Sequence, residues 1–69
     1  MEPRYKLGDF VAKYTGDYRY AGWVVAVYFK RGGALRYVVE DVRGLNFIFN
    51  ENSLEYAKEE DYPIELGEI

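Results

Sequence analysis

Short apolar runs separated by glycine-containing segments make up most of the chain. Four runs have the length and the β-branched and aromatic content of strands: 9–14, 23–29, 35–41 and 45–49. The run 23–29 is almost continuously apolar, which predicts a central strand buried on both faces. Gly33 and Gly44 follow the second and third runs and predict tight turns, because glycine readily adopts positive φ. Short strands and turns at this spacing predict an all-β domain.

A fifth segment, 54–58, has two interpretations. It can form a short helix, with Asn52 as its cap and Glu55 at capping-box spacing. It can also form a fifth strand, which we favour because five strands close a small barrel and remove exposed edges. The predicted fold is therefore all-β: a small five-stranded SH3-like barrel over residues 1–58, with a 3₁₀ turn near 50–53. An acidic C-terminal tail follows over 59–69.

Length and composition point to self-association. The chain has 69 residues and contains neither cysteine nor histidine. Domains this small have thin cores and often depend on disulfides, a metal or assembly, and assembly is the aid that remains here. Residues 1–50 carry a net charge of +3 and residues 51–69 a net charge of −6. The acidic end can therefore shield the body of the domain or bind a basic partner.

The usual parts of an enzyme are absent from the sequence. Ser53 and Thr15 have no histidine or cysteine to activate them, and no glycine-rich phosphate loop is present. We therefore expect a non-catalytic protein with no cofactor and no metal. The start of the chain lacks the apolar core of a signal peptide, and no apolar run approaches the roughly 20 residues of a membrane span. We expect a cytoplasmic protein that does not bind membranes.

Nucleic-acid binding is an alternative from a different class. Basic residues are interleaved with tyrosines such as Tyr14, Tyr18 and Tyr20, and small barrels stack bases on aromatic rings beside basic side chains. The sequence pI of about 4.8 lacks the basic signature of such proteins, so this function is possible but not favoured. A tyrosine cage for a methylated ammonium group is a further alternative.

Two stretches resemble the type II dihydrofolate reductases, the plasmid-borne enzymes that confer trimethoprim resistance. The first stretch, 7–28, contains G-D-x-V-x-K and later G-x-x-V-x-x-Y; the second, 37–55, contains Y-x-V-E, a glycine, an I-F pair and L-E. The resemblance implies an SH3-like barrel that assembles as a homotetramer around a central pore. Folate and NADPH bind in that pore, which is lined by a lysine and a V-Q-I-Y strand.

The pore residues of that family fall on Lys13 and on the segment Asn46-Phe47-Ile48-Phe49. Phe47 stands where the family has glutamine, and Phe49 where it has tyrosine. The polar lining of such a pore is therefore largely lost, and we expect the fold of the family without its reductase activity. A divergent pore protein that binds a nucleotide or pterin remains the alternative to a non-catalytic module.

The same apolar segment predicts a protein–protein interface. An apolar strand on a very small domain is typical of a subunit or partner contact, or else it packs beneath the tail. We expect a homo-oligomer or a complex with a larger protein, in which the chain acts as an assembly or inhibitory module. The candidate contact residues are Lys13, Tyr20, Asn46, Phe47, Ile48 and Phe49, with tail contacts from Tyr62, Ile64 and Leu66.

Overall fold

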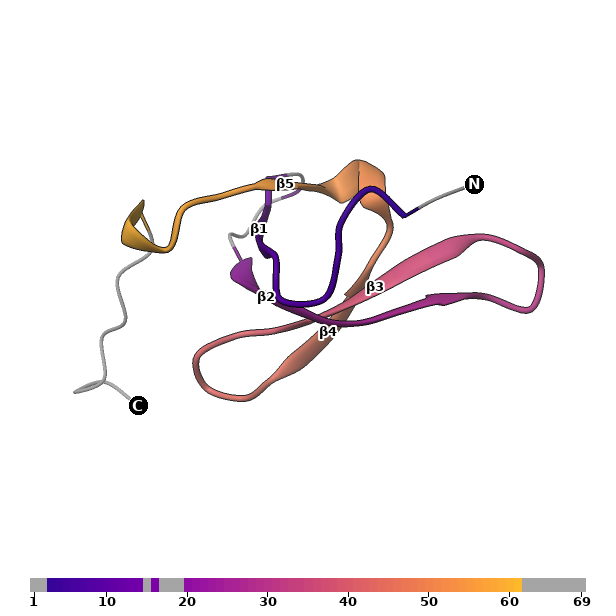
Figure 1. Cartoon of the computed structure of the whole chain (residues 1–69), viewed down its shortest axis with the longest axis horizontal. Coiled ribbons are helices and arrows are strands. Elements are labelled where there is room, and N and C mark those ends of the chain that lie inside the picture. Colours follow the sequence, from indigo (N-terminus) through magenta and orange to yellow (C-terminus); the bar gives the residue numbers. More distant parts are fainter. Residues whose placement is uncertain (1–2, 15, 17–19, 62–69) are drawn as a thin grey trace.

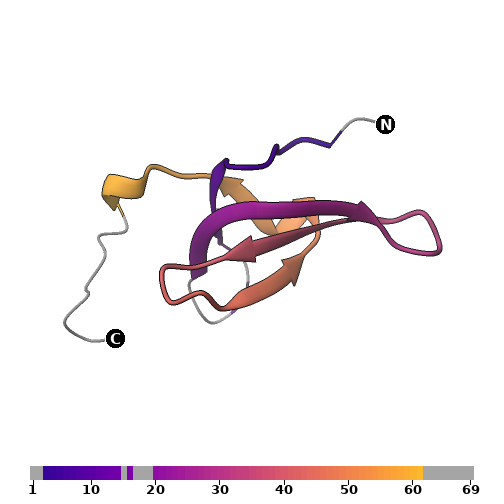
Figure 2. The same ribbon diagram turned by 60° about the horizontal axis from the view of Figure 1, so that its bottom comes forward.

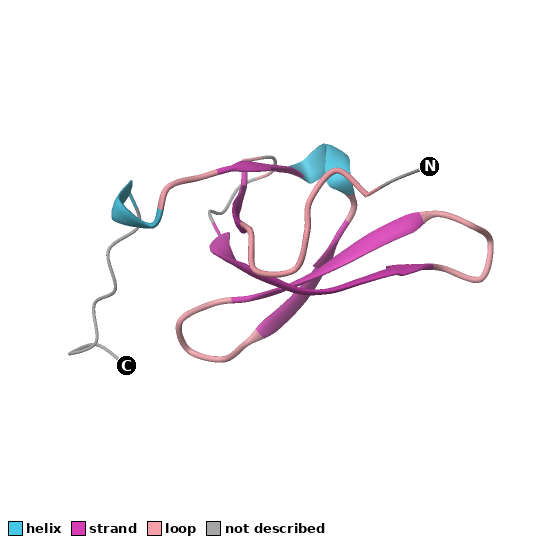
Figure 3. Cartoon of the chain, in the orientation of Figure 1, coloured by secondary structure: helices cyan, strands magenta, loops and turns pink. Residues whose placement is uncertain are grey.

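The computed structural model describes residues 3–14, 16 and 20–61, which form one antiparallel sheet (Figure 1). Its strands are β1 (Phe10–Lys13), β2 (Tyr20–Phe29), β3 (Leu35–Glu40), β4 (Asn46–Phe49) and β5 (Leu54–Tyr56), in the order β4-β3-β2-β1-β5. Two 3₁₀ turns, η1 (Glu51–Ser53) and η2 (Glu59–Asp61), are the helical elements of the described residues (Figure 3). The predicted all-β fold is confirmed. None of the described helical elements is long and apolar enough to cross a membrane.

The segment after β4 forms the turn and the strand that the sequence predicts. The Asn50 side chain accepts a hydrogen bond from the Ser53 backbone N–H at 3.0 Å and so caps η1. β5 follows at once and pairs with β1, with Leu54 opposite Lys13. The strand interpretation of this segment is confirmed, and the alternative of a helix there is wrong. η2 begins the predicted acidic tail, whereas the contact residues predicted in 62–69 lie outside the described residues.

Glycines shape the two hairpins, as predicted. Gly33 has φ +96° and its N–H donates to the Lys30 carbonyl at 2.8 Å, which reverses the chain between β2 and β3. Gly44 has φ +85° and its N–H donates to the Asp41 carbonyl at 3.0 Å between β3 and β4. The two turns lie at opposite ends of β3, as a meander requires (Figure 1).

β2 begins three residues before the predicted run 23–29 and includes Gly22. Gly22 is buried opposite Val11, and a Cβ at this position would collide with the carbonyl oxygen of Glu40. Glycine is therefore needed here for a close approach of two strands, not for a turn. The sequence signal is the same in both cases, so the predicted start of the strand at residue 23 was three residues late.

A β-bulge bends β2 in the middle. Its first residues pair with β1 and its later residues with β3, and the register shifts between Val24 and Ala26. Val25 is the extra residue, and the strand curves over the rest of the molecule (Figure 2). The bend lets a single sheet enclose a core on its concave face. That core consists of Tyr5, Val11, Tyr20, Val24, Tyr37, Val39, Phe49 and Leu54.

Tyr5 lies in the centre of this core, although it precedes the first strand. Its side chain is fully buried, and its ring makes edge contacts with the rings of Tyr37, at 5.2 Å between centroids, and Tyr56, at 4.8 Å. The Tyr5 hydroxyl donates to the Leu54 carbonyl at 2.8 Å, and the Tyr37 hydroxyl accepts the N–H of Arg4 at 2.7 Å. The N-terminal segment is thus part of the domain's core and not a mere lead-in.

Two further expectations are corrected by the sheet. Among the described strands, β4 and β5 are edge strands that do not pair with each other, so the predicted closure into a barrel is wrong. The turn η1 carries the chain from one edge of the sheet to the other, and β5 is only three residues long. Burial of the second strand on both faces is also wrong, since Val25 and Tyr28 are exposed on a convex face that no second layer of the described residues covers.

Candidate interaction edge

Strand β4 combines an open edge with apolar side chains. Phe49, Ile48, Phe47 and Asn46 lie opposite four successive residues of β3, from Tyr37 to Glu40. Because side chains alternate across a strand, Phe47 and Phe49 share the core face and Asn46 and Ile48 the convex face. The contacts agree with this assignment: the Phe47 ring lies 4.7 Å from the Tyr20 ring, whereas Ile48 is 59% exposed.

The hydrogen bonding of the β3–β4 turn shows which backbone groups of β4 face the open side. The Asp41 N–H donates to the Leu45 carbonyl at 3.0 Å, so the backbone of Asp41 faces β4 at the end of the ladder, in the orientation of a hydrogen-bonded pair. Such pairs alternate along an antiparallel ladder, which makes the pairs of Phe47 and Phe49 with β3 the hydrogen-bonded ones. The N–H and C=O groups of Asn46 and Ile48 therefore point away from β3, along the open edge.

Within the described residues, this edge lacks the charged, proline and bulge protections against pairing with another strand. Edge strands are commonly protected by lysine, proline, a bulge or an inward-pointing charge. The sequence of β4 is Asn-Phe-Ile-Phe, and its ladder with β3 is regular over all four residues. The strand is thus a regular, uncharged template for another β-strand.

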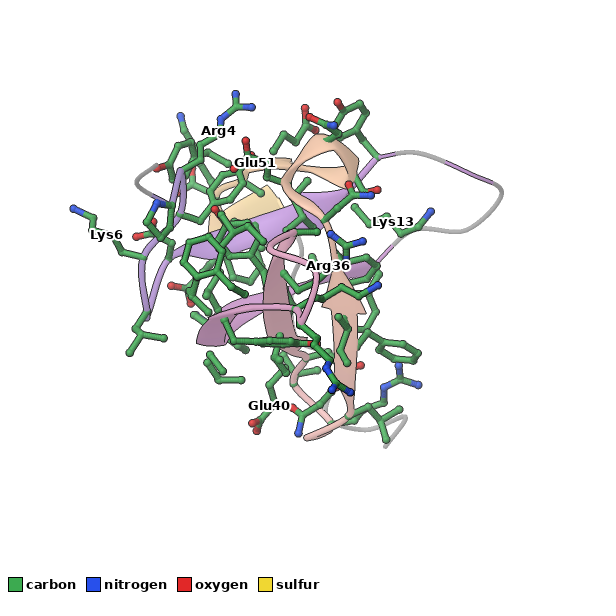
Figure 4. All side chains as sticks on the ribbon, turned by 90° about the vertical axis from the view of Figure 1, so that its right-hand side faces the viewer. Arg4, Lys6, Lys13, Arg36, Glu40 and Glu51 are labelled. Carbon is green, nitrogen blue, oxygen red and sulfur yellow. The ribbon has the colours of Figure 1, made fainter. Side chains whose placement is uncertain are left out.

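An apolar row crosses the convex face and ends at this edge. Ala26, Val38 and Ile48 lie opposite one another on three neighbouring strands. Charged side chains bracket the row on β3, because Arg36 and Glu40 lie two residues to either side of Val38 on the same face (Figure 4). The row therefore presents an apolar strip between two charges, with its most exposed member at the open edge.

Asp41 fixes the turn that presents β4. Its buried carboxylate accepts the backbone N–H groups of Arg43 at 2.9 Å and Leu45 at 3.0 Å, and it pairs with the Arg43 guanidinium at 2.6 Å. Burial would raise the pKa of the Asp41 carboxyl, but these hydrogen bonds outweigh it and hold that pKa below its usual value. Sequence reasoning had treated Asp41 only as the end of a strand. The sequence does contain a signal for this role: an aspartate at the start of a glycine-containing turn commonly accepts hydrogen bonds from the backbone N–H groups of that turn.

Tyr20, predicted as a contact residue, lies in the core instead. Only 7% of it is exposed, and its hydroxyl is within hydrogen-bonding distance of the Val39 carbonyl, at 2.9 Å, and the Leu45 carbonyl, at 2.7 Å. Burial, followed by the charge of Asp41, raises the pKa of Tyr20 to about 12. Tyr20 therefore stays protonated at neutral pH. It ties the start of β4 to β3 and supports the Phe47 ring from below.

Lys13 is not brought into register with β4. Two strands separate β1 from β4 in the sheet, and the Lys13 side chain extends outward from the molecule (Figure 4). Its Nζ lies close over Gly16, where a Cβ would come within 2.7 Å of it. The predicted set is thus divided: Asn46–Phe49 form one edge strand, Tyr20 packs beneath it in the core, and Lys13 lies on β1, two strands away. Within the described ranges, no three acidic side chains form a group that could hold a metal ion.

The chain was compared with family models, with curated proteins and with solved structures. No family model matches the chain, and no match was found among curated proteins or among solved structures.

Proposed function

We propose that this chain is a non-catalytic binding or assembly module that acts through protein–protein contacts, and that β4 is its binding edge. The observation that carries the proposal is the unprotected edge of Asn46–Phe49, where the backbone groups of Asn46 and Ile48 face outward. An added strand would satisfy these groups with main-chain hydrogen bonds, as in other cases of strand addition. The exposed Ile48 side chain and the half-exposed Phe47 ring would supply apolar contacts.

An SH3-like architecture is part of the proposal. It is supported by a meander of four strands, a bent β2 and a short β5 that returns to β1 after a 3₁₀ turn. The resemblance to type II dihydrofolate reductases favours the same architecture. We do not extend the proposal to a ligand pore, because Phe47 and Phe49, at the pore positions of that family, pack against Tyr20.

The absence of catalysis is proposed on chemical grounds. The sequence has no histidine or cysteine, so neither a thiolate nor an imidazole base can act at neutral pH. Beside β4, the hydroxyl of Tyr20 is occupied by two backbone carbonyls and the Asp41 carboxylate by the Arg43 side chain and two backbone N–H groups. These groups hold the strand in place and are not free to react.

Site-specific photo-crosslinking in the host cell tests the binding edge. A photoreactive amino acid at Asn46 should capture a protein, whereas the same group at Ala34, exposed at the tip of the β2–β3 hairpin, should capture little. Adding Ile48→Pro removes one outward N–H without removing a hydrogen bond to β3, so it should abolish the capture at Asn46. Ile48→Thr keeps that N–H and serves as the matched control. Equal capture at Asn46 and Ala34, or capture that survives Ile48→Pro, would overturn the proposal.

A further inference from the structure

The β4 segment has a sequence that reads the same in both directions. Residues 46–50 are Asn-Phe-Ile-Phe-Asn, with Ile48 at the centre. A strand that pairs antiparallel with its own copy about a two-fold axis places residues equally distant from the centre opposite each other. In this segment every such pair consists of identical residues. This property has no effect on the folding of one chain, but it matters for pairing between two chains.

We propose that the strand accepted by β4 is β4 of a second copy of this chain, a step that rests on the proposed binding edge. The two strands would pair antiparallel about a two-fold axis through Ile48. The two sheets would then join into one continuous sheet. The register sets Ile48 opposite Ile48 of the second copy, Phe47 opposite the other Phe49, and Asn46 opposite the other Asn50.

The backbone supports this register. Asn46 and Ile48 direct their N–H and C=O groups to the open edge, so Ile48 can form a hydrogen-bonded pair with its own copy at the axis. An offset of one residue between the two strands would place core-face residues opposite convex-face residues, which the pleat does not allow. The next allowed register, centred on Phe47, would set Ile48 opposite Asn46 and lose the match between like residues.

The side chains on both faces gain suitable neighbours in this register. On the convex face, Ile48 meets Ile48, so the apolar row from Ala26 through Val38 continues across the axis. On the core face, the half-exposed Phe47 ring meets a second phenylalanine beside the existing Tyr20–Phe47 pair. At the ends of the pairing, the Asn50 side-chain NH2, whose Oδ1 partner atom caps η1, can donate to the Asn46 side-chain oxygen of the second copy.

Charge also favours a second copy over a foreign strand. A two-fold axis brings charges near their own images, and each chain carries a net charge of −3. None of residues 46–50 is charged, so the strand can approach itself without like-charge repulsion at the contact. Pairing of β4 with a strand of a different protein would not require residues 46–50 to be uncharged or to read the same in both directions. Because the paired segment is short, we expect a reversible dimer that dissociates on dilution.

Sedimentation velocity and amide exchange on the purified full chain test the dimer. Over about 1 μM to 1 mM protein, the sedimentation coefficient should rise from that of a monomer to that of a dimer. The amides of Asn46 and Ile48 should gain protection at high concentration, while those of Phe47 and Phe49 are protected throughout. Ile48→Lys should keep the chain monomeric. Val25→Lys, the same change at another exposed residue of the convex face, should leave the dimer intact.

Cysteine substitutions test the register in a chain that has no native cysteine. Two Ile48→Cys residues would face each other at the axis with Cα atoms roughly 5.5 Å apart, within the range of a disulfide. Ile48→Cys alone should therefore form a covalent dimer. Asn46→Cys alone should not, but it should crosslink when mixed with Asn50→Cys chains. Crosslinking of Phe47→Cys without that of Ile48→Cys would overturn the register.

The outcomes separate this inference from the proposed function. A chain that stays monomeric to 1 mM, with unprotected Ile48 amides, but captures a foreign protein at Asn46 would overturn the dimer and leave the binding edge standing. A monomer that captures nothing at Asn46 would overturn both. A dimer that survives Ile48→Lys would also overturn the inference, because its contact would lie elsewhere on the molecule.

Discussion

The two edges of the sheet differ in how well the chain protects them. At the β5 edge, the backbone N–H and C=O groups of Leu54 and Tyr56 point away from β1, because the flanking Ser53 carbonyl and Ala57 N–H bond to Tyr14 and Phe10. The Tyr5 hydroxyl occupies the outward Leu54 carbonyl, the strand is three residues long, and an exposed glutamate lies at its middle. At the β4 edge, by contrast, no side chain of the described residues occupies the outward groups of Asn46 and Ile48.

The contrast shows where this small sheet accepts another strand. If only the backbone determined where another strand can pair, both edges would be equally open, since every edge strand presents unpaired N–H and C=O groups. The N-terminal segment protects one edge only, because Tyr5 anchors it across the end of β5. Selective protection of one edge leaves the molecule with a single direction for growth of the sheet. This asymmetry can be tested by removing the protection or by weakening the open edge.

The largest effect is expected from Tyr5→Ala. Loss of a fully buried aromatic ring in a core this small should cost about 3–5 kcal/mol of unfolding free energy. Urea denaturation followed by tyrosine fluorescence measures this cost. Tyr5→Phe is the control, since it keeps the ring and removes only the bond to Leu54, with an expected loss of about 1 kcal/mol. Similar losses for the two variants would show that the ring does not hold the N-terminal segment on β5.

Asp41→Ala should have a smaller effect than Tyr5→Ala and should act on the open edge. It leaves the Leu45 N–H without its partner and frees the turn before β4, at an expected cost of about 1–3 kcal/mol. Hydrogen exchange of the β4 amides should accelerate more than that of the β1 amides. Arg43→Ala removes only the half-exposed partner of the ion pair and should cost less, about 1 kcal/mol at most. An equal cost for both variants would contradict the role given to the backbone bonds.

The acid sensitivity of the domain should depend on the same carboxylate. The pKa of Asp41 in the folded chain lies below the value of about 3.9 expected when it is unfolded. Its contribution to stability is therefore complete above pH 4 and disappears as the pH falls through the folded pKa. Asp41→Asn should be less stable than the parent chain at neutral pH, and the difference should narrow toward pH 2. Chemical denaturation over this range measures it, and a constant difference would refute the linkage.

The smallest effect on folding is expected at the binding edge itself. Ile48 is mostly exposed in the single chain, so Ile48→Lys should change the unfolding free energy by no more than about 0.5 kcal/mol under monomeric conditions. The same substitution should abolish association. Phe49→Ala, one residue further along β4 but buried, should cost about 3–5 kcal/mol. A large loss of stability in Ile48→Lys would mean that the edge serves folding and not binding.

Part of the candidate site could be predicted from the sequence. Residues 46–49 were recognised as an apolar strand and a contact surface, because their composition contrasts with the polar turns on either side. That Phe47 and Phe49 face the core while Asn46 and Ile48 face outward depends on the pairing with β3. Tyr20 shows the limit of the approach: it was predicted to be a contact residue, yet it is buried beneath β4.

The sequence by itself determined the local structure of this protein. The strand character of the apolar runs, the turns at Gly33 and Gly44 and the 3₁₀ turn after β4 depend on neighbours along the chain, and these form as expected. Only the tertiary structure decided that Tyr5 belongs to the core, that Gly22 lies within β2 close to Glu40 and that β4 stays an open edge. These features depend on contacts between residues far apart in the sequence. A one-residue change in register would turn core side chains to the other face, and pairing of β4 with β5 would close the open edge.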